Sequence, residues 1–372
     1  MAILGAVTPS LDPLGIPINV LIADDSLTMR AFLTDAITSD PSIHVIATAK
    51  NGHDCIDKAL QTKPDVILLD LEMPIMGGLD ALNKIMDLYP TPVIIVSAYA
   101  REGAKATIQA LENGAFDYVE KPASITDTYR IRDELIIKIR NAAQADMRKI
   151  KLIKDQCYPI VTLRRLRKPS KKADRVIIIG ASTGGPQALF NIFRTIPPDF
   201  PSPVLVVQHM PKEFTKSFAE RLNSVCGIRV KEAENGDEIM QGRALVAPGS
   251  YHMEVLSNGS RVRLKSTPPV NFVRPSVDVT MMSAASAFKN SCIGVLLTGM
   301  GRDGADGMSK IVKVGGVTIA EDQSTSVVYG MPRAAVEIGA ATKILPLDKI
   351  VPDLIKLTNG VSAKSSLKAI YS

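Results

Sequence analysis

The sequence has no apolar run long enough to span a bilayer. Its longest uninterrupted apolar stretches, around VILLD and GVLLTG, are far shorter than the roughly 20 residues that a membrane helix needs. The first residues, MAILGAVTPSLDPLG, lack the basic region that opens a secretory signal. We therefore expect a soluble chain that is neither exported nor inserted in a membrane, and that works in the cytoplasm.

Cysteine and histidine are also scarce. The cysteines Cys55, Cys157, Cys226 and Cys292 are scattered and form no C-x-x-C pair, and the 4 histidines are not clustered. Neither a disulfide framework nor a zinc site is indicated, and a reducing compartment fits this pattern.

The charge of the chain is unevenly distributed. Residues 1–129 carry 8 Lys/Arg and 17 Asp/Glu, residues 130–175 carry 15 and 5, and the remainder carries 21 and 16. The basic stretch RRLRKPSKKADR lacks periodic apolar residues and contains a proline, which is typical of a solvated linker. Nucleic-acid binding is the less favoured alternative, because no helix-turn-helix pattern or aromatic platform accompanies the basic residues.

These features predict two domains of α/β class, each a doubly wound parallel sheet. Short apolar runs alternate with amphipathic stretches both before and after the basic stretch. We place a first domain, flavodoxin-like in its strand pattern, at residues 18–140, a basic linker at 141–173 and a second domain at 174–358. An N-terminal extension of 17 residues precedes them.

Polar side chains gather at the predicted strand ends of the first domain. Asp24 and Asp25 follow the run INVLIA, Asp70 ends DVILLD, Ser97 follows PVIIV and Lys121 follows FDYVE. The carboxyl ends of parallel strands share one edge of the sheet, so these groups should converge there. Oxygen ligands of this kind favour a hard ion such as Mg²⁺. The alternative is that each aspartate caps a helix, which explains single residues better than it explains the whole set.

At these positions the first domain resembles a response-regulator receiver domain, through the motifs ADDS, LLDLEMP, VSA and EKP. The resemblance implies that Asp70 accepts a phosphoryl group from a histidine kinase. It also implies that Asp24, Asp25, Asp70 and the backbone of Glu72 hold Mg²⁺.

The same resemblance assigns roles to three further residues. Lys121 would pair with the charge on the acyl phosphate, and Ser97 and Tyr118 would form a switch pair that moves on phosphorylation. It also makes Lys121–Pro122 a candidate cis peptide, since only X-Pro bonds adopt the cis form at low cost.

In the second domain the stretch VIIIGASTGGPQALF places a serine between a predicted strand and a helix. The glycines around Ser182 permit a sharp turn, and the helix that follows offers N–H groups to an oxyanion. Ser182 is therefore a candidate nucleophile, although a loop residue or helix N-cap would also fit an isolated G-x-S-x-G motif.

A serine nucleophile needs a base and an orienting acid. His209 follows the apolar run VLVVQ and stands at a strand end, as Ser182 does, whereas His252 does not. Asp303 and Asp306 follow the run GVLL in a glycine-rich loop, and either could orient the imidazole. A phosphate cradle is the alternative for this loop, but it lacks the lysine of a P-loop.

The chain order Ser, His, Asp and the blocks GASTGGPQAL, QHMP, APGSYHM, LLTGMGRDGADGM and DQSTSVVYGMPRAA resemble the CheB family of protein-glutamate methylesterases of bacterial chemotaxis. The resemblance implies Ser182 as nucleophile, His209 as general base and Asp303, rather than Asp306, as orienting acid. It also implies that the N–H groups of Met300 and Thr183 stabilise the oxyanion.

The implied substrates are γ-glutamyl methyl esters, and also glutamines, on helical chemoreceptors, and the esterase chemistry needs no cofactor. The resemblance further implies that the unphosphorylated receiver blocks the hydrolase cleft. The competing hypothesis is a non-enzymatic response regulator whose second domain binds a partner or nucleic acid through the basic linker.

Overall fold

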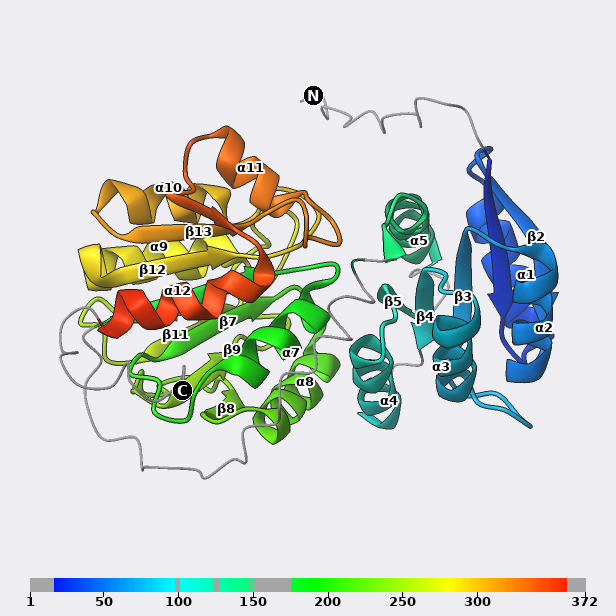
Figure 1. Cartoon of the computed structure of the whole chain (residues 1–372), viewed down its shortest axis with the longest axis horizontal. Helices are drawn as coiled ribbons and strands as arrows, with labels where there is room; N and C mark the ends of the chain where they lie inside the picture. The colour runs from blue at the N-terminus through cyan, green and yellow to red at the C-terminus, as the bar shows by residue number, and fades with distance from the viewer. Residues whose placement is uncertain (1–16, 98–100, 123–127, 148, 150–174, 360–372) are drawn as a thin grey trace, which may run out of the picture. The chain divides into compact units, whose positions relative to one another are not determined.

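The computed structural model describes residues 17–97, 101–122, 128–147, 149 and 175–359 (Figure 1). The chain forms two compact units, one around a five-stranded sheet and one around a seven-stranded sheet. In both, helices connect most of the consecutive strands of the parallel sheet, which confirms the predicted α/β class. The N-terminal extension and most of the predicted linker lie outside the described residues.

The sheet of the first unit has the strand order β2-β1-β3-β4-β5. The pairings of β1 with β2 and β3, and of β3 with β4, are parallel. Its strands are β1 (Ile18–Ala23), β2 (Ile43–Ala49), β3 (Val66–Asp70), β4 (Val93–Ser97) and β5 (Asp117–Glu120). The helices that alternate with them along the chain are α1 (Leu27–Thr38), α2 (Gly52–Thr62), α3 (Gly78–Leu88), α4 (Arg101–Glu112) and α5 (Thr128–Ala143).

Local sequence explains where these elements lie. Every residue of β3 and β4 is buried, as expected for central strands of a parallel sheet with helices on both faces. In the edge strand β2, exposed residues alternate with buried or partly buried ones. Helices α1 and α2 begin at polar caps: the side chain of Ser26 accepts a hydrogen bond from Met29 N, and that of Asn51 accepts one from Asp54 N.

The sheet of the second unit has the order β14-β13-β12-β6-β7-β9-β8, and its paired strands are parallel. Its strands are β6 (Val176–Ala181), β7 (Val204–Gln208), β8 (Arg229–Glu232), β9 (Arg243–Val246), β12 (Cys292–Leu296), β13 (Val317–Glu321) and β14 (Lys343–Leu345). A separate antiparallel hairpin joins β10 (His252–Val255) to β11 (Val262–Lys265). The sequence patterns did not predict the edge strands β8 and β14 or this hairpin.

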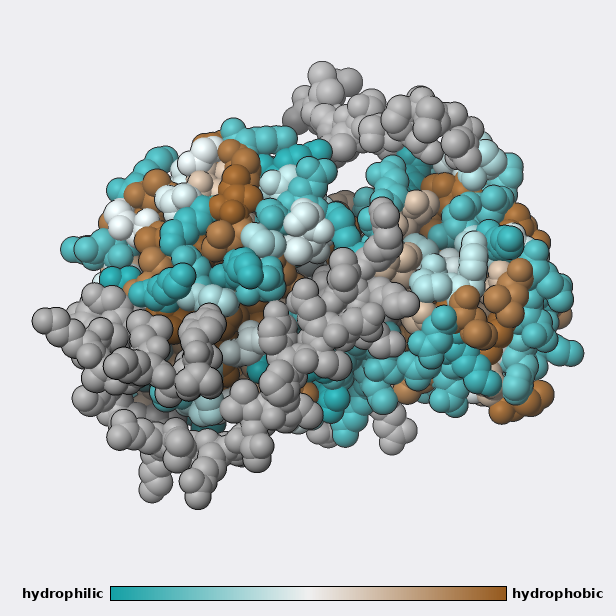
Figure 2. Space-filling view, in the orientation of Figure 1, coloured by the Kyte–Doolittle hydropathy of each residue, from teal (hydrophilic) through white to brown (hydrophobic). Residues whose placement is uncertain are grey.

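Helices cover both faces of the larger sheet (Figure 1). One group, α7, α8 and α12, packs together, and the other group consists of α9, α10 and α11. Their bounds are α7 (Gly185–Thr195), α8 (Lys212–Val225), α9 (Val277–Phe288), α10 (Ala305–Lys313), α11 (Met331–Glu337) and α12 (Leu347–Asn359), with a 3₁₀ turn η2 (Lys289–Ser291) after α9. Among all described residues, no helix combines the length and apolarity needed to cross a bilayer. Hydrophilic residues alternate with small hydrophobic areas on the face shown in Figure 2.

The topology of each sheet marks where function is expected. In the smaller sheet the chain reverses its direction of winding between β1 and β3, and in the larger sheet it does so between β6 and β12. Ligands and reacting groups of open α/β sheets collect beyond the carboxyl ends of strands at such a switch point. The predicted site residues of both domains follow these strands.

Candidate functional sites

Ser182 lies on the tight turn between β6 and α7. The peptide N–H of Gly185 donates to Ser182 O at 2.8 Å, which closes the turn, and Ser182 N donates to Thr298 O at 3.1 Å. Gly184 adopts φ +74°, a left-handed conformation that side chains rarely tolerate. The turn thus holds Ser182 at the end of β6, between the strand and the first turn of α7.

His209 follows β7 and is tied to the same edge of the sheet. Ala181 at the end of β6 pairs with Gln208 at the end of β7, and His209 N donates to Ala181 O at 3.1 Å. The amide of Gln208 also donates to Ser182 O at 3.0 Å. The serine and the histidine therefore occupy adjacent strand ends linked by hydrogen bonds.

Asp303 approaches the histidine from the loop after β12, on the other side of β6. Its Oδ2 lies 2.8 Å from His209 Nε2, and both side chains are largely buried. Because Nε2 faces the carboxylate, Nδ1 is the ring nitrogen left to act toward a nucleophile. Among the described residues, no hydrogen bond joins the Ser182 hydroxyl to the imidazole in this structure.

The Asp303 carboxylate is surrounded by hydrogen-bond donors. Oδ1 accepts from Ser276 Oγ at 2.7 Å and from Asn271 Nδ2 at 3.1 Å, and Oδ2 accepts from Val277 N at 2.6 Å. Burial alone would raise the pKa of Asp303, but the hydrogen bond and charge of His209 and the donors at the start of α9 lower it to about 2. The acid is therefore held ionised, in a fixed position, beside the imidazole.

A second buried carboxylate, Asp278, lies beside the first. Its Oδ1 accepts from Gly307 N in the first turn of α10 at 2.6 Å, and its Oδ2 accepts from Asn271 Nδ2 at 2.8 Å. Burial raises the pKa of Asp278 to about 6, and the charges of Asp303 and Asp306 add to the effect. One amide, that of Asn271, thus bridges two acids at the starts of α9 and α10.

The loop from Thr298 to Met300 is packed against the serine. A Cβ on Gly299 would meet Ser182 Cβ at 2.8 Å, so only glycine allows this approach. Gly299 N donates to Val328 O at 3.0 Å and Gly299 O accepts from Met331 N at 2.8 Å, which fixes the backbone just before Met300. The arrangement is suited to presenting backbone donors near the serine.

Glu321, at the end of β13, binds the backbone of that loop. It is completely buried, and its Oε2 accepts from Thr298 N at 2.8 Å. Burial raises the pKa of Glu321 to about 7. The glutamate is therefore held close to its titration point near neutral pH, next to the backbone that carries Met300.

His252 and Asp306, the alternative candidates for base and acid, have other partners. Both ring nitrogens of the buried His252 are engaged, one with Pro268 O at 3.1 Å and the other with Ser276 N at 3.2 Å. Asp306 is half exposed and forms a surface ion pair with Arg302 at 3.3 Å. Neither residue contacts His209.

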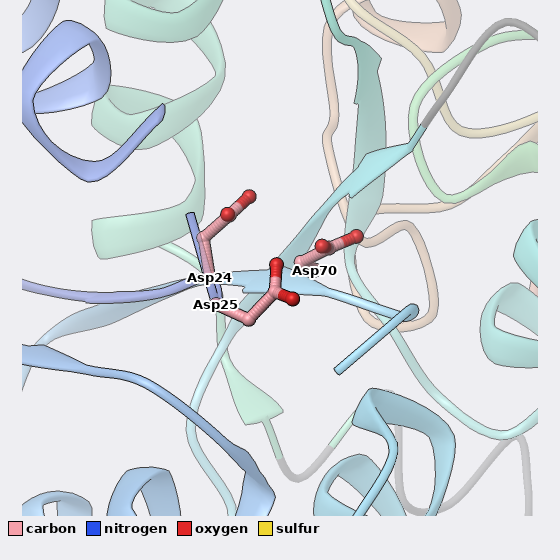
Figure 3. Close-up of side chains that lie close together, drawn as sticks. All are labelled: Asp24, Asp25 and Asp70. Carbon is pink, nitrogen blue, oxygen red and sulfur yellow. The ribbon is translucent and has the colours of Figure 1, made fainter. Parts of the chain in front are cut away.

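The first unit gathers three aspartates at the carboxyl edge of its sheet, as Figure 3 shows. One oxygen from each of Asp24, Asp25 and Asp70 lies within 4.8 Å of the others. Lys121 Nζ lies 2.8 Å from both Asp24 Oδ2 and Asp70 Oδ2. An all-oxygen set of three carboxylates fits a hard divalent cation such as Mg²⁺.

Burial and charge set the titration of this cluster. Burial raises the pKa of Asp70, and the neighbouring Asp24 adds to this, while the hydrogen bond from Lys121 opposes it. Burial alone would lower the pKa of Lys121, but its contacts with Asp24 and Asp70 raise it. The lysine therefore stays charged and compensates part of the negative charge.

The other predicted residues of the first domain lie just after β3 and on β4 and β5. Glu72 N donates to Asp70 Oδ1 at 3.3 Å, Ser97 is buried at the end of β4, and Tyr118 is buried in β5. The expectation of a cis Lys121–Pro122 bond is wrong: among described residues the cis peptide is Arg274–Pro275. The trans form remains the lower in energy for most X-Pro bonds, and a motif alone does not overcome that preference.

Sequence reasoning missed the residues that hold Asp303. Ser276, Asn271 and Asp278 come from the stretch NFVRPSVD, which has no apolar periodicity and follows no predicted strand. Its Ser-Val-Asp signal, a cap residue with an acid in the first helical turn, indicates only that a helix starts there. Which carboxylate that helix start would bind depends on tertiary packing.

Comparisons with known proteins agree with both halves of the chain. The family model described as CheB methylesterase matches residues 177–354, and the response regulator receiver domain model matches residues 20–131. A protein-glutamate methylesterase/protein-glutamine glutaminase of Pyrococcus horikoshii is 46% identical over 92% of this chain and 94% of its own length. One of the same name from Symbiobacterium thermophilum is 49% identical over 90% and 95%. The crystal structure of the Thermotoga maritima CheB methylesterase catalytic domain is 46% identical, with a TM-score of 0.48, and the match covers 49% of this chain and 98% of that one.

Proposed function

Since the chain belongs to the CheB methylesterase family, a family of hydrolases, and carries a receiver domain, we propose that it hydrolyses γ-glutamyl methyl esters on chemoreceptors and deamidates their glutamines. The relatives' name, protein-glutamate methylesterase/protein-glutamine glutaminase, supports both activities. The single observation that carries the proposal is the 2.8 Å contact of His209 Nε2 with the ionised Asp303, at the strand end next to Ser182.

In the proposed acylation step, Ser182 Oγ attacks the ester carbonyl and its proton passes to His209 Nδ1. Asp303 stabilises the imidazolium that forms, because its carboxylate remains charged against Nε2. Catalytic hydrogen bonds often tighten only when substrate binds, so the serine hydroxyl would reach Nδ1 in that complex. The imidazolium then protonates the leaving methoxide, which departs as methanol.

Deacylation repeats these transfers with water. His209 Nδ1 takes a proton from the attacking water, the acyl bond to Ser182 breaks, and the serine recovers its proton while glutamate is released. A glutamine side chain passes through the same tetrahedral intermediate and releases ammonia in place of methanol. The N–H groups of Met300 and Thr183 would stabilise the oxyanion in each step, and the close packing of Gly299 on Ser182 supports this role for Met300.

We further propose that Asp70 is phosphorylated by a histidine kinase and that this controls the esterase. Asp24, Asp25, Asp70 and the backbone of Glu72 would hold Mg²⁺, which when bound neutralises charge on the phosphoryl oxygens. Lys121 already contacts Asp70 and would pair with the modified side chain. Ser97 and Tyr118 would respond to the new charge.

Two measurements test the esterase. A serine-directed fluorophosphonate should label Ser182 in the full chain, because only an activated serine reacts with this probe. Methylated receptor membranes should release methanol when the protein is added. An absence of labelling together with an absence of methanol release would favour a non-enzymatic response regulator.

A further inference from the structure

A rigid loop projects beside the catalytic acid and carries an aromatic residue at its tip. The loop spans residues 266–275, STPPVNFVRP, between β11 and α9. Phe272 is 101% exposed, more than any other large hydrophobic side chain among the described residues. Single exposed apolar residues are common on protein surfaces, so the exposure becomes informative only with the geometry of the loop.

The tip of the loop is a tight turn with an unusual backbone. Val270 N donates to Val273 O at 3.1 Å, and Val273 N donates to Val270 O at 3.0 Å. The two residues between them are left-handed, Asn271 with φ +51° and Phe272 with φ +65°. Turns of this kind favour Asn-Gly, and a bulky residue at the glycine position is strained. Strain of this sort is concentrated at functional sites.

Three sets of hydrogen bonds hold the loop in place. Arg274 Nη1 donates to Ser266 O at 3.0 Å and to Thr267 O at 2.9 Å. His252 Nε2 contacts Pro268 O at 3.1 Å. Asn271 Nδ2 binds the catalytic acid and its neighbour, as described above. The aromatic side chain is thus exposed to solvent on a loop that hydrogen bonds hold in one conformation. Such preorganisation lowers the entropy cost of binding.

The turn of residues 270–273 lies next to the proposed catalytic residues. Asn271 Nδ2 lies 3.1 Å from Asp303 Oδ1, and Asp303 Oδ2 lies 2.8 Å from His209 Nε2. Phe272 directly follows Asn271, which binds the acid of the proposed triad, so it lies close to that acid. Val270, 37% exposed, is on the same turn, and Met300, 43% exposed, follows Gly299 next to Ser182. A partner whose side chain enters this site will meet apolar groups around it.

We propose that Phe272 is a substrate-contacting residue that packs on the apolar stripe of an amphipathic helix while that helix presents its glutamyl ester to Ser182. The inference rests on the proposed function and specifies how its protein substrate is recognised. On a helix, the neighbours of an ester-bearing position are the residues three and four away. Apolar residues there would give Phe272 a surface to cover, and a free amino-acid ester would not.

The test compares three substrates with the full-length chain under one set of conditions. The first is an amphipathic helical peptide with one glutamyl methyl ester flanked by leucines at the three- and four-residue spacings. The second has glutamine at those leucine positions, since glutamine preserves helix propensity. The third is N-acetyl-glutamate γ-methyl ester, which is too small to reach the loop.

We expect Phe272→Gly to lower kcat/KM on the leucine peptide about tenfold, a typical effect of removing an aromatic contact residue. Its activity on the small ester should be unchanged, and its unfolding temperature should be equal or higher because glycine relieves the left-handed strain. The wild type should have a lower kcat/KM on the glutamine peptide than on the leucine peptide. On the glutamine peptide, Phe272→Gly should cause no further loss of kcat/KM. Phe272→Leu should retain part of the peptide activity.

Ile344→Ala is the control, because Ile344 is 48% exposed on the edge strand β14, away from β6. It should behave as the wild type does on all three substrates. Equal losses by Phe272→Gly on the peptide and the small ester, or no loss on either, would overturn the inference. Ser182→Ala separates this failure from failure of the proposed function, because it should abolish turnover of every substrate only if Ser182 is the nucleophile.

Discussion

Replacing Asp303 with asparagine should abolish most esterase activity, and the structure indicates how the variant would be arranged. Each oxygen of Asp303 accepts hydrogen bonds, Oδ2 from His209 and Val277 N, and Oδ1 from Ser276 and Asn271. An amide keeps one acceptor oxygen. It should remain at the Oδ2 position, because the backbone N–H of Val277 donates there at 2.6 Å, whereas the backbone N–H of Asp278 is more distant from Oδ1, at 3.3 Å. The new NH₂ group would then face Ser276, Asn271 and the N–H of Asp278.

The size of the effect follows from the loss of a buried charge. Removing one partner of a buried ion pair costs about 3–5 kcal/mol, and here the pair exists when His209 becomes protonated during the reaction. If that stabilisation is lost in the transition state, kcat falls by about 10²- to 10⁴-fold. Methanol release from methylated receptor membranes measures this directly.

Asp303→Asn should also change stability with a defined pH dependence. The pKa of Asp303 is about 2 in the folded chain, against an ordinary value of 3.8. This difference corresponds to about 2 kcal/mol of stability, which is present above pH about 4 and is lost as pH falls toward about 2. Asp278, with a pKa near 6, acts in the opposite direction and at higher pH. Urea unfolding of the variant should therefore lack the acidic component, and the Asp278 component should become smaller because the charge of Asp303 helps to raise the pKa of Asp278.

Asp306→Asn is the matched control, since it removes the same charge three residues further along, in the first turn of α10. Asp306 is half exposed and paired only at the surface with Arg302, so its replacement should change turnover by less than about twofold. The reasoning is refuted if Asp303→Asn retains near-native turnover, or if the two variants lose activity to the same extent.

Four further outcomes are expected. Ser182→Ala and His209→Ala should each remove most activity, and the double variant should be little worse than either, which methanol release would show; near-additive losses would contradict a shared step. Asp70→Ala, or EDTA in excess, should prevent labelling by a small radioactive phosphodonor, and undiminished labelling would exclude Asp70 as the acceptor. Removal of residues 1–140 should raise turnover on receptors more than on a small ester, provided that circular dichroism shows a folded fragment; a folded fragment that is no faster would exclude inhibition by the receiver. Glu321 has a pKa near 7 in the folded chain, against an ordinary value of 4.5, and this difference corresponds to about 3 kcal/mol of stability that is present below pH 4.5 and lost as pH rises through about 7. Glu321→Gln should therefore flatten this decline of the free energy of unfolding in urea. An unchanged pH profile would contradict the assignment.

Much of the fold could be predicted because buried parallel strands have a strong sequence signal. β3 and β6 are continuous apolar runs, and both were located from the sequence to within a residue. β8, with the sequence RVKE, and β14, with KIL, lie at sheet edges and lack such a run. The hairpin of β10 and β11 mixes charged and apolar residues, so its pairing is decided by packing against the rest of the unit.

The candidate site could be predicted only in its innermost part. Ser182 and His209 follow central strands, and strand ends in a parallel sheet share one edge, so their proximity follows from topology. Asn271 and Asp278 could not be found in this way. The contact of Asn271 with Asp303 and that of Asp278 with Gly307 require α9 and α10 to meet at their first turns, and no local pattern encodes that meeting. The catalytic roles of these residues remain predictions.

The exchange of carboxylates between α9 and α10 links chemistry to mechanical integrity. Asp303, just before α10, accepts from the first turn of α9, and Asp278 on α9 accepts from Gly307 in the first turn of α10. Each acid neutralises the positive end of the other helix, so neither helix can fray without releasing a charge that the other needs. The proposed catalytic acid therefore also holds the two helices together, and heat should not separate Asp303 from the imidazole while the two helices stay docked. Thermal loss of activity and loss of amide protection at Val277 and Gly307 should then be one event rather than two.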